Sequence, residues 1–234
     1  MSKSYSNAYY TFNQYRYWLK DFLSNQFQTW RTPARLFDAF HSLEKDSKVL
    51  DVGCGKGELL ARMHNLRPEL ELTGVDITDA PLVDSEIKRI TANALALPFP
   101  DNSFNLVVCR HVIEHIPDSS KLFSELARVV KKGGKLYIEC PDVRSTRTRL
   151  ATNFYDDPTH VRPYTQTALK RLADEYGIQT ICSGRWRNMA ICLLGIFYFP
   201  VALLYRDHDY IEGFWRNLLG TWIWYIGEKR ISEC

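Results

Sequence analysis

The sequence predicts an α/β fold in which a mostly parallel sheet is covered by helices on both faces. Between residues 48 and 184, short apolar runs of strand length alternate with segments whose apolar residues recur at helical spacing. Apolar strands that alternate with amphipathic helices are typical of a parallel sheet that is buried on both sides. With 234 residues, the chain is long enough to bury a core without disulfide or metal support.

The expected helices are marked by the residues at their ends. The clearest helix covers 119–132, where Asp118 or Ser119 caps its start and a basic stretch followed by Gly133 ends it. A later helix stops at Gly177. Helices are expected over 58–66, 119–132 and 165–176, and strands over 48–52, 70–75, 87–92, 104–109, 135–140 and 178–183.

Two segments lie outside this alternation. Residues 1–47 are rich in aromatic side chains and predict two helices, the second of which begins after Thr32-Pro33. We expect this segment to form a helical lid over a ligand pocket, and plain core packing is the alternative. Residues 185–219 contain 17 consecutive uncharged residues, 189–205, and are followed by a strand over 222–227.

Composition excludes several classes of protein. The chain carries 30 basic and 27 acidic residues, so a net charge of +3 gives no electrostatic case for nucleic acid as the main partner. A charged fraction of 24% and an aromatic fraction of 13% exclude global disorder. The six cysteines show neither C-x-x-C nor zinc-type spacing, which favours reduced thiols in the cytoplasm. The first sixteen residues lack the apolar core of a secretory signal.

A glycine-rich loop follows the first expected strand and opens the first helix of the alternating region. Gly53, Gly55 and Gly57 would let the backbone turn sharply and approach a ligand closely. Asp76 ends the next strand, where a carboxylate can accept hydrogen bonds from ribose hydroxyls. The spacing G-x-G-x-G, with acidic Asp51 just before it, differs from the G-x-G-x-x-G of dinucleotide sites. It favours a cationic ligand without phosphate, such as S-adenosylmethionine.

Four motifs in register carry a resemblance to a known family. The residues are VLDVGCGKG (49–57), GVDI (74–77), ANALALPFPDNSFN (92–105) together with HVIEHI (111–116), and ARVVKKGG (127–134). They resemble the class I S-adenosylmethionine-dependent methyltransferases, in the type 11 or ubiquinone-biosynthesis-like branch. The resemblance covers about residues 48–140.

The resemblance implies a Rossmann-like sheet of seven strands, with an antiparallel last strand at 222–227 and 185–219 as an apolar helical insertion in a methyltransferase domain over 48–234. It implies S-adenosylmethionine as the cofactor, with its methionine part beside the glycine loop, its ribose on Asp76 and its adenine on Ile77. Asn93 stands where the family usually has Asp. The implied cofactor-binding residues are Asp51, Gly53, Cys54, Gly55, Gly57, Asp76, Ile77, Asn93, Ala94 and Arg110.

A second dense stretch, residues 155–165, lies between the fifth strand and the next helix, at the edge where parallel sheets bind ligands. It is similar to a segment of methyltransferases that tailor bacterial glycans and surface lipids. Asp157, Arg162 and Tyr164 are therefore expected to bind the substrate, and His160 is a candidate base. The alternative for His160 is a structural role in ordering the loop. Arg162 has a purely structural alternative, an ion pair with Asp156 or Asp157.

His111, just past the fourth strand, is the second catalytic candidate. It is four residues before His115, but a metal site needs further ligands that the sequence does not offer, so we expect none. A charge-free stretch of 17 residues, interrupted by Gly195 and Pro200, is short for a membrane-spanning helix of about 20 residues. The insertion 185–219 is expected to contact a membrane peripherally, to cap an apolar acceptor or to form a homodimer interface.

Taken together, these features predict an enzyme, a cytoplasmic and peripherally membrane-associated methyltransferase. It would transfer a methyl group to a small-molecule, glycan or lipid-linked acceptor, at a hydroxyl oxygen. The absence of an Asn/Asp-Pro-Pro-Tyr motif after the fourth strand argues against methylation of exocyclic or amide nitrogens. The alternatives are a methyltransferase-like binding subunit without catalysis and an RNA methyltransferase, which the small net charge disfavours.

Overall fold

We describe a computed structural model in which residues 34–79, 81–84, 86–147, 153–186 and 218–231 are defined, together with residues 203, 211 and 215. The chain divides into two compact units, residues 1–37 and residues 38–234. The helix predicted around residues 18–23 lies outside the described residues, as does the apolar stretch 189–205 except for Leu203. Within the part of the chain that is described, no helix combines the length and the apolar character needed to cross a bilayer.

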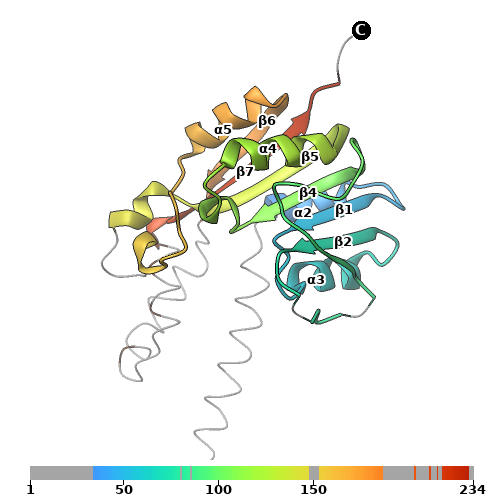
Figure 1. The fold of residues 1–234 in the computed structure, drawn as a ribbon, viewed down its shortest axis with the longest axis horizontal. Coiled ribbons are helices and arrows are strands. Elements are labelled where there is room, and N and C mark those ends of the chain that lie inside the picture. Colours follow the sequence, from blue (N-terminus) through green and yellow to red (C-terminus); the bar gives the residue numbers. More distant parts are fainter. Residues whose placement is uncertain are drawn as a thin grey trace, which may run out of the picture. The chain divides into compact units, whose positions relative to one another are not determined.

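The second unit is built around a sheet of seven strands in the order β3-β2-β1-β4-β5-β7-β6 (Figure 1). Strands β1, β2, β3, β4 and β5 are parallel to one another, and β7 runs antiparallel to both β5 and β6. This confirms the predicted mostly parallel sheet with an antiparallel last strand. The strands are β1 (Lys48–Val52), β2 (Glu71–Asp76), β3 (Lys88–Thr91), β4 (Phe104–Arg110), β5 (Val130–Pro141), β6 (Ile178–Arg185) and β7 (Trp222–Lys229).

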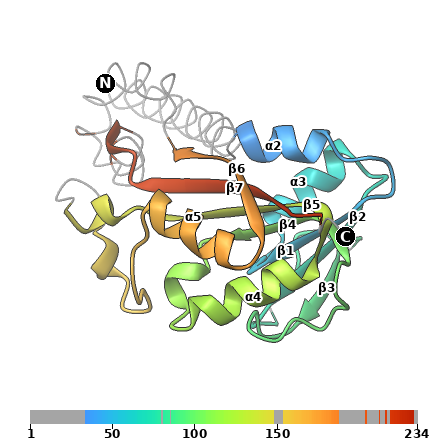
Figure 2. The ribbon, with the colours of Figure 1, turned by 90° about the horizontal axis from the view of Figure 1, so that it is seen from above.

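The helices lie on both faces of this sheet, as the alternating pattern predicts. Helix α3 covers one face, and α4 and α5 lie together on the opposite face (Figure 2). Asp118 is the cap of α4 and accepts from the backbone N–H of Lys121, and Thr165 caps α5 in the same way. The helical elements are α2 (Ala34–His41), α3 (Glu58–Leu66), α4 (Ser119–Val129) and α5 (Gln166–Glu175), with the short 3-10 helices η1 (Ile113–His115), η2 (Val143–Arg147) and η3 (Phe154–Asp156).

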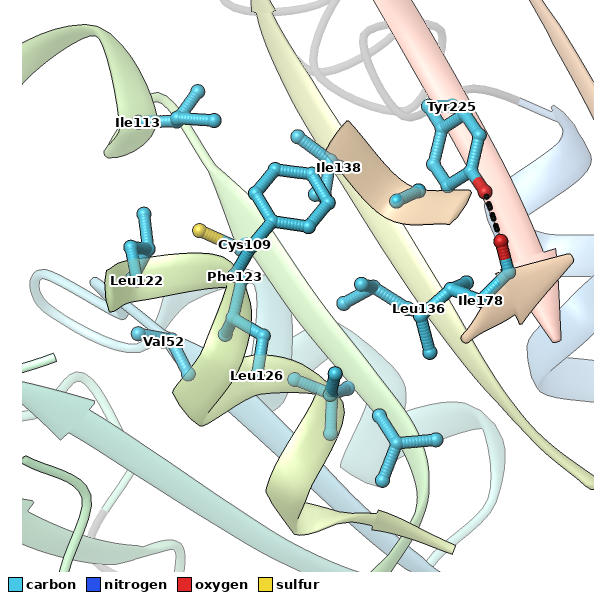
Figure 3. Close-up of a cluster of buried hydrophobic side chains, with 14 of the residues drawn as sticks. Val52, Cys109, Ile113, Leu122, Phe123, Leu126, Leu136, Ile138, Ile178 and Tyr225 are labelled. Atoms are coloured by element: carbon cyan, nitrogen blue, oxygen red, sulfur yellow. Dashed lines mark hydrogen bonds between the residues drawn. The ribbon is translucent and has the colours of Figure 1, made fainter. Parts of the chain in front are cut away.

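The core lies between the central strands and helices α4 and α5. Its side chains come from β1, β4, β5, β6, β7 and the apolar face of α4 (Figure 3). Leu169 and Ala173 of α5 also belong to it. Tyr225 of β7 is fully buried, and its hydroxyl donates to the backbone carbonyl of Ile178 at 3.4 Å. Because the central strands β1 and β4 are buried on both faces, the sheet holds its carboxyl edge, where the glycine loop begins, in a fixed position.

One predicted boundary is wrong. The helix expected to reach residue 132 ends at Val129, because Val130 takes an extended conformation and begins β5. Val130 is fully buried and pairs with Phe104 of β4, after which the register shifts. A β-branched side chain that is buried against a neighbouring strand favours the strand over one more turn of helix.

Candidate active site

The glycine loop leaves the carboxyl end of β1 and turns back into α3. Gly53, Gly55 and Gly57 all have positive φ angles, of 78°, 54° and 75°. A side chain at Gly53 would also collide with Val112, because an added Cβ would lie 2.1 Å from its Cγ2 atom. The N–H groups of Gly53 and Cys54 both donate to the carbonyl of Val75 in β2. The loop is therefore tied to the neighbouring strand, and only glycine fits its first position.

A cavity of about 320 Å³ opens over this loop at the carboxyl edge of the sheet. Its volume falls in the range of small-molecule sites. Six of the predicted site residues line it: Asp51, Gly53, Cys54, Gly55, Arg110 and His111. The other lining residues are Lys56, Glu58 and Leu59.

A larger hollow of about 700 Å³ lies at the opposite edge, at the amino ends of the strands. Its lining mixes lysines with glutamates, such as Lys48 with Glu71, and these two side chains form an exposed ion pair. Ligands of open α/β sheets bind outside the carboxyl ends of the strands, where the helix N-termini and glycine loops are. This rule favours the smaller cavity as the place of the expected cofactor site.

Asp51 places a carboxyl group with unusual ionisation behaviour in the cavity. The residue is 4% exposed, and its burial raises its pKa from 3.8 to about 7. Arg110 partly opposes this shift, and the charge of Asp76 adds to it. Asp51 therefore changes charge near neutral pH, and a cationic ligand would favour its ionised form. The nearby thiol of Cys54 stays neutral, since burial and then the charge of Asp51 raise its pKa to about 11.

Asp76 joins the end of β2 to the glycine loop. Its Oδ2 atom accepts from the N–H of Gly55 at 2.8 Å, and its Oδ1 atom accepts from both the N–H and the hydroxyl of Thr78. Although partial desolvation raises the pKa of Asp76, these hydrogen bonds outweigh it and the pKa is lowered. The carboxylate is thus ionised, and Oδ2 retains a lone pair for a ligand hydroxyl.

The predicted adenine-side residues lie beyond the cavity lining. Ile77 is 73% exposed and follows Asp76 directly, which leaves its side chain available to a flat ligand surface. The side-chain oxygen of Asn93 accepts from the N–H of Leu95 at 2.9 Å, so it shapes the turn that contains Ala94. Gly57 is the N-cap of α3 in the left-handed conformation. These positions agree with an elongated ligand running from Asp51 towards the end of β3.

Arg110 and His111, at the end of β4, meet a buried carboxylate of β5. Glu139 is fully buried, and its Oε1 atom lies 3.2 Å from Arg110 and 3.2 Å from Nε2 of His111. Burial raises the pKa of Glu139, but the charges and hydrogen bonds of these two side chains outweigh it and hold the pKa at about 2. The other carboxylate oxygen accepts from the hydroxyl of Tyr137. This network fixes the cation of Arg110 on the cavity wall.

His111 is a charged group rather than a free imidazole. Its Nδ1 atom lies 3.3 Å from Glu114, so both ring nitrogens face carboxylates. Desolvation lowers its pKa, but the hydrogen bonds to Glu114 and Glu139 prevail and raise the pKa from 6.5 to about 9. At neutral pH the ring carries two protons and donates with both nitrogens. This geometry suits an orienting or charge-stabilising role better than that of a general base.

The 153–165 segment lies beyond the carboxyl end of β5 (Figure 1). The backbone N–H of Val161 ties it to η1 by donating to the carbonyl of Glu114. Arg162 donates to the hydroxyls of Tyr164 and Ser119, so these contacts replace the predicted ion pair with Asp156 or Asp157. Tyr164 is 3% exposed and its backbone pairs with Asp142. Arg162 and Tyr164 therefore hold the loop, whereas Asp157, with a side chain 45% exposed, faces solvent.

Sequence reasoning missed two residues that shape the site. Arg89 of β3 donates to the carbonyls of Gly55 and Thr78, and so clamps the loop to the end of β2. Glu139 organises both cations at the end of β4. A glutamate within the apolar run Leu136–Cys140 is the signal that could have pointed to Glu139, since a buried charge is kept only with partners. For Arg89 the sequence holds no comparable signal.

Comparisons with known proteins indicate the family of the chain. A family model described as a methyltransferase domain matches residues 17–183, which is well over half of the chain. Curated relatives include a ubiquinone biosynthesis O-methyltransferase of Pseudomonas entomophila, 40% identical over 101 residues, which cover 38% of this chain and 42% of the relative. A ubiquinone biosynthesis O-methyltransferase of Pseudomonas putida is 39% identical over 101 residues, which again cover 38% of this chain and 42% of the relative. The chain thus spans less than half the length of these relatives.

Solved structures share the fold. Phosphoethanolamine N-methyltransferase 2 of Haemonchus contortus, in complex with S-adenosyl-L-methionine, has a TM-score of 0.65 and 20% identity over 85% of this chain and 52% of that one. A SAM-dependent methyltransferase of Archaeoglobus fulgidus has a TM-score of 0.60 and 23% identity over 84% of this chain and 92% of that one. At these identities the likeness concerns the fold. Together with the family match and the glycine loop, it establishes that this chain belongs to the class I S-adenosylmethionine-dependent methyltransferases of the type 11 kind.

Proposed function

We propose that this enzyme transfers the methyl group of S-adenosylmethionine to a hydroxyl oxygen of a small-molecule, glycan or lipid-linked acceptor. The observation that carries the proposal is the cavity over the glycine loop, which combines the buried carboxyl of Asp51 with the fixed cation of Arg110. The curated relatives named ubiquinone biosynthesis O-methyltransferases support oxygen as the methylated atom. The apolar insertion 185–219 would serve an apolar acceptor, a membrane surface or a second subunit.

The residues of the cavity fit the cofactor group by group. The ionised form of Asp51 suits the ammonium and sulfonium charges, which favour a nearby anion. The Nε atom of Arg110 is buried and has no hydrogen-bond partner among the described residues, so it is available to the carboxylate of the methionine part. The remaining lone pair of Asp76 is available to a ribose hydroxyl.

Methyl transfer needs alignment and, for a hydroxyl acceptor, removal of a proton. When bound, the cofactor supplies a methyl group on a positively charged sulfur, which an acceptor oxygen attacks in line. His111 already carries its proton at neutral pH, so it can orient an acceptor but not deprotonate it. His160 donates through Nδ1 to the carbonyl of Phe154, and its Nε2 atom therefore keeps a lone pair. Of the two predicted catalytic histidines, His160 is therefore the better candidate to accept a proton from the acceptor hydroxyl.

Replacement of Asp76 by alanine is expected to weaken S-adenosylmethionine binding at least tenfold. The variant loses one charge-assisted hydrogen bond to the ribose and the contact that holds the N–H of Gly55. Isothermal titration calorimetry measures the change. The matched control is Asp174→Ala, which removes an exposed ion pair with Arg230 far along the chain and should leave the affinity unchanged. Equal affinities of the two variants would contradict the assignment of Asp76, and no binding by the wild type would contradict the whole proposal.

The affinity for S-adenosylmethionine is expected to rise as the pH increases through about 7. Asp51 has a raised pKa of about 7, so below that pH it is mostly protonated and neutral, and a cationic ligand binds it less well. S-adenosylhomocysteine lacks the sulfonium charge and should show a shallower pH dependence. Asp51→Asn removes the ionisation, so the affinities for the two ligands should then depend on pH in the same way. Parallel pH profiles of both ligands in the wild type would show that Asp51 does not sense the sulfonium.

The acceptor is tested by turnover. A panel of quinol, glycan and lipid acceptors with free hydroxyl groups is incubated with enzyme and cofactor, and released S-adenosylhomocysteine is measured. We expect turnover with a hydroxylated acceptor and none with its O-methylated counterpart. If only amine acceptors are methylated, oxygen is the wrong atom, although the cofactor assignment stands.

A further inference from the structure

Two histidines and a buried glutamate meet beside the cavity, from parts of the chain that the sequence keeps apart. Glu114 and His115 belong to η1, which follows β4, and His160 follows η3. The backbone N–H of Val161 donates to the carbonyl of Glu114 at 2.7 Å, which holds the two segments together. One ligand atom from each of Glu114, His115 and His160 lies within 4.8 Å of the other two.

The hydrogen bonds around His115 fix which of its nitrogens has a lone pair. Its Nδ1 atom lies 2.9 Å from the hydroxyl oxygen of Thr159. That hydroxyl lies 2.6 Å from a carboxylate oxygen of Asp157. Because an ionised carboxylate can only accept, the single proton of Thr159 goes to Asp157, and its oxygen must accept from His115. His115 therefore carries its proton on Nδ1 and a lone pair on Nε2.

His160 is oriented in the same way by a different partner. Its Nδ1 atom lies 2.7 Å from the backbone carbonyl of Phe154, which can only accept, so Nδ1 carries the proton and Nε2 the lone pair. The ring stacks on the Phe154 side chain at a centroid distance of 4.5 Å and lies 4.7 Å from the His115 ring. Asp157 adds a carboxylate oxygen 3.8 Å from Nε2. Histidine metal ligands typically donate their second nitrogen to a carbonyl, hydroxyl or carboxylate in this manner.

Glu114 supplies the negative charge. It is 1% exposed, and while its Oε1 atom lies 3.3 Å from His111, its Oε2 atom is buried without a hydrogen-bond partner among the described residues. An unpartnered buried carboxylate oxygen is costly, and a bound cation would satisfy it.

We propose that Glu114, His115 and His160 bind a divalent transition-metal ion of the zinc, cobalt or manganese kind. Two neutral imidazoles and one carboxylate are a ligand set that such ions prefer, whereas magnesium and calcium favour oxygen ligands alone. Ligand atoms within 4.8 Å of one another would have to close on the ion to the bond lengths of about 2.0–2.2 Å that zinc requires. From the sequence we considered only His111 and His115 and expected no metal. In the proposed set His111 is not a ligand, and Glu114 and His160 join His115.

The location of the proposed metal site indicates what a bound ion would do in catalysis. Three protein ligands leave at least one coordination position open for water or another oxygen. Glu114 also contacts His111, which lines the cofactor cavity, so the ion would lie next to the region that an acceptor must occupy. If the proposed function is right, a hydroxyl bound to the ion would lose its proton more readily, and His160 would act as a ligand rather than as a free base.

The test is Co²⁺ binding to the full chain, followed by visible d–d absorption and by calorimetry. We expect the wild type to bind one Co²⁺ that Zn²⁺ displaces, and His115→Ala and His160→Ala to weaken binding at least tenfold. Thr159→Val removes only the partner of Nδ1 of His115 and should weaken binding less. The matched control is His64→Ala, since the ring nitrogens of His64 also face carboxylates, Asp84 at 3.1 Å and Glu86 at 3.5 Å, outside the cluster.

Each variant is also titrated with S-adenosylmethionine, which tests the fold and keeps the two proposals apart. Retained cofactor binding with lost Co²⁺ binding in the cluster variants alone supports the metal site. The metal proposal is overturned if the wild type binds no Co²⁺, or if His64→Ala loses binding as much as the cluster variants do. Neither of these results touches the methyltransferase proposal, which depends on cofactor binding and turnover.

Discussion

Glu139→Gln is expected to lower the free energy of unfolding by about 3–5 kcal/mol, the usual cost of breaking a buried ion pair from one side. Glutamine keeps the shape of the side chain but removes the charge that faces Arg110 and His111. His111 can lose its proton in response, but Arg110 stays charged. Urea denaturation at pH 7 measures the loss, and the fixed orientation of Arg110 in the cavity should be lost with it.

The control for this variant is Glu71→Gln, which removes an exposed ion pair with Lys48 and should change the stability by no more than about 1 kcal/mol. The pH dependence gives an independent check. The pKa of Glu139 is lowered from 4.5 to about 2, so its contribution is complete above pH 4.5 and is lost as the pH falls towards 2. The difference between wild type and variant should shrink over that window. A constant difference would show that Glu139 acts through packing rather than charge.

Gly53→Ala is expected to destabilise the protein by about 2–5 kcal/mol, as the sum of backbone strain and overpacking. Its φ angle of 78° is unfavourable for any side chain, and the added Cβ would lie 2.1 Å from Cγ2 of Val112. Since Val112 follows His111 directly, relief of the collision would also move the wall of the cofactor cavity. Cofactor affinity should therefore fall together with the stability.

Gly55→Ala separates the two contributions. Gly55 also has a positive φ, of 54°, but an added Cβ would meet nothing within 4 Å, so only the backbone strain of about 1–2 kcal/mol is expected. Combining Gly53→Ala with Val112→Ala should recover the part that is due to the collision, as a favourable coupling in a double-mutant cycle. If Gly53→Ala is no more destabilising than Gly55→Ala, the contact with Val112 is not the reason for glycine at this position.

The sequence predicted the order and type of the elements well because each carries its own local signal. The apolar run at 48–52 and the helix at 58–66 appear with the predicted bounds, and Asp118 caps α4 as proposed. These features depend on periodicity and on capping, which involve neighbouring residues only. The boundary at 129–130 was wrong because burial against β4, a contact distant in sequence, decided it.

The candidate site divides in the same manner. The glycine loop and Asp76 were visible because their residue types and spacing are typical of a cofactor site. The roles of Arg89 and Glu139 were not, because each depends on partners from other strands of the sheet. The interpretation of His111 also changed, because the buried carboxylates of Glu114 and Glu139 contact its ring and make it a cation.

By itself, then, the sequence determined the α/β alternation, the glycine loop at which we propose that the cofactor binds, and the family. These follow from short-range patterns that a single segment of chain can carry. Only the tertiary structure decided the charge states at the end of β4 and the meeting of Glu114, His115 and His160. The physical reason is that a pKa or a ligand cluster depends on distances between atoms, and the folding of separate segments sets those distances.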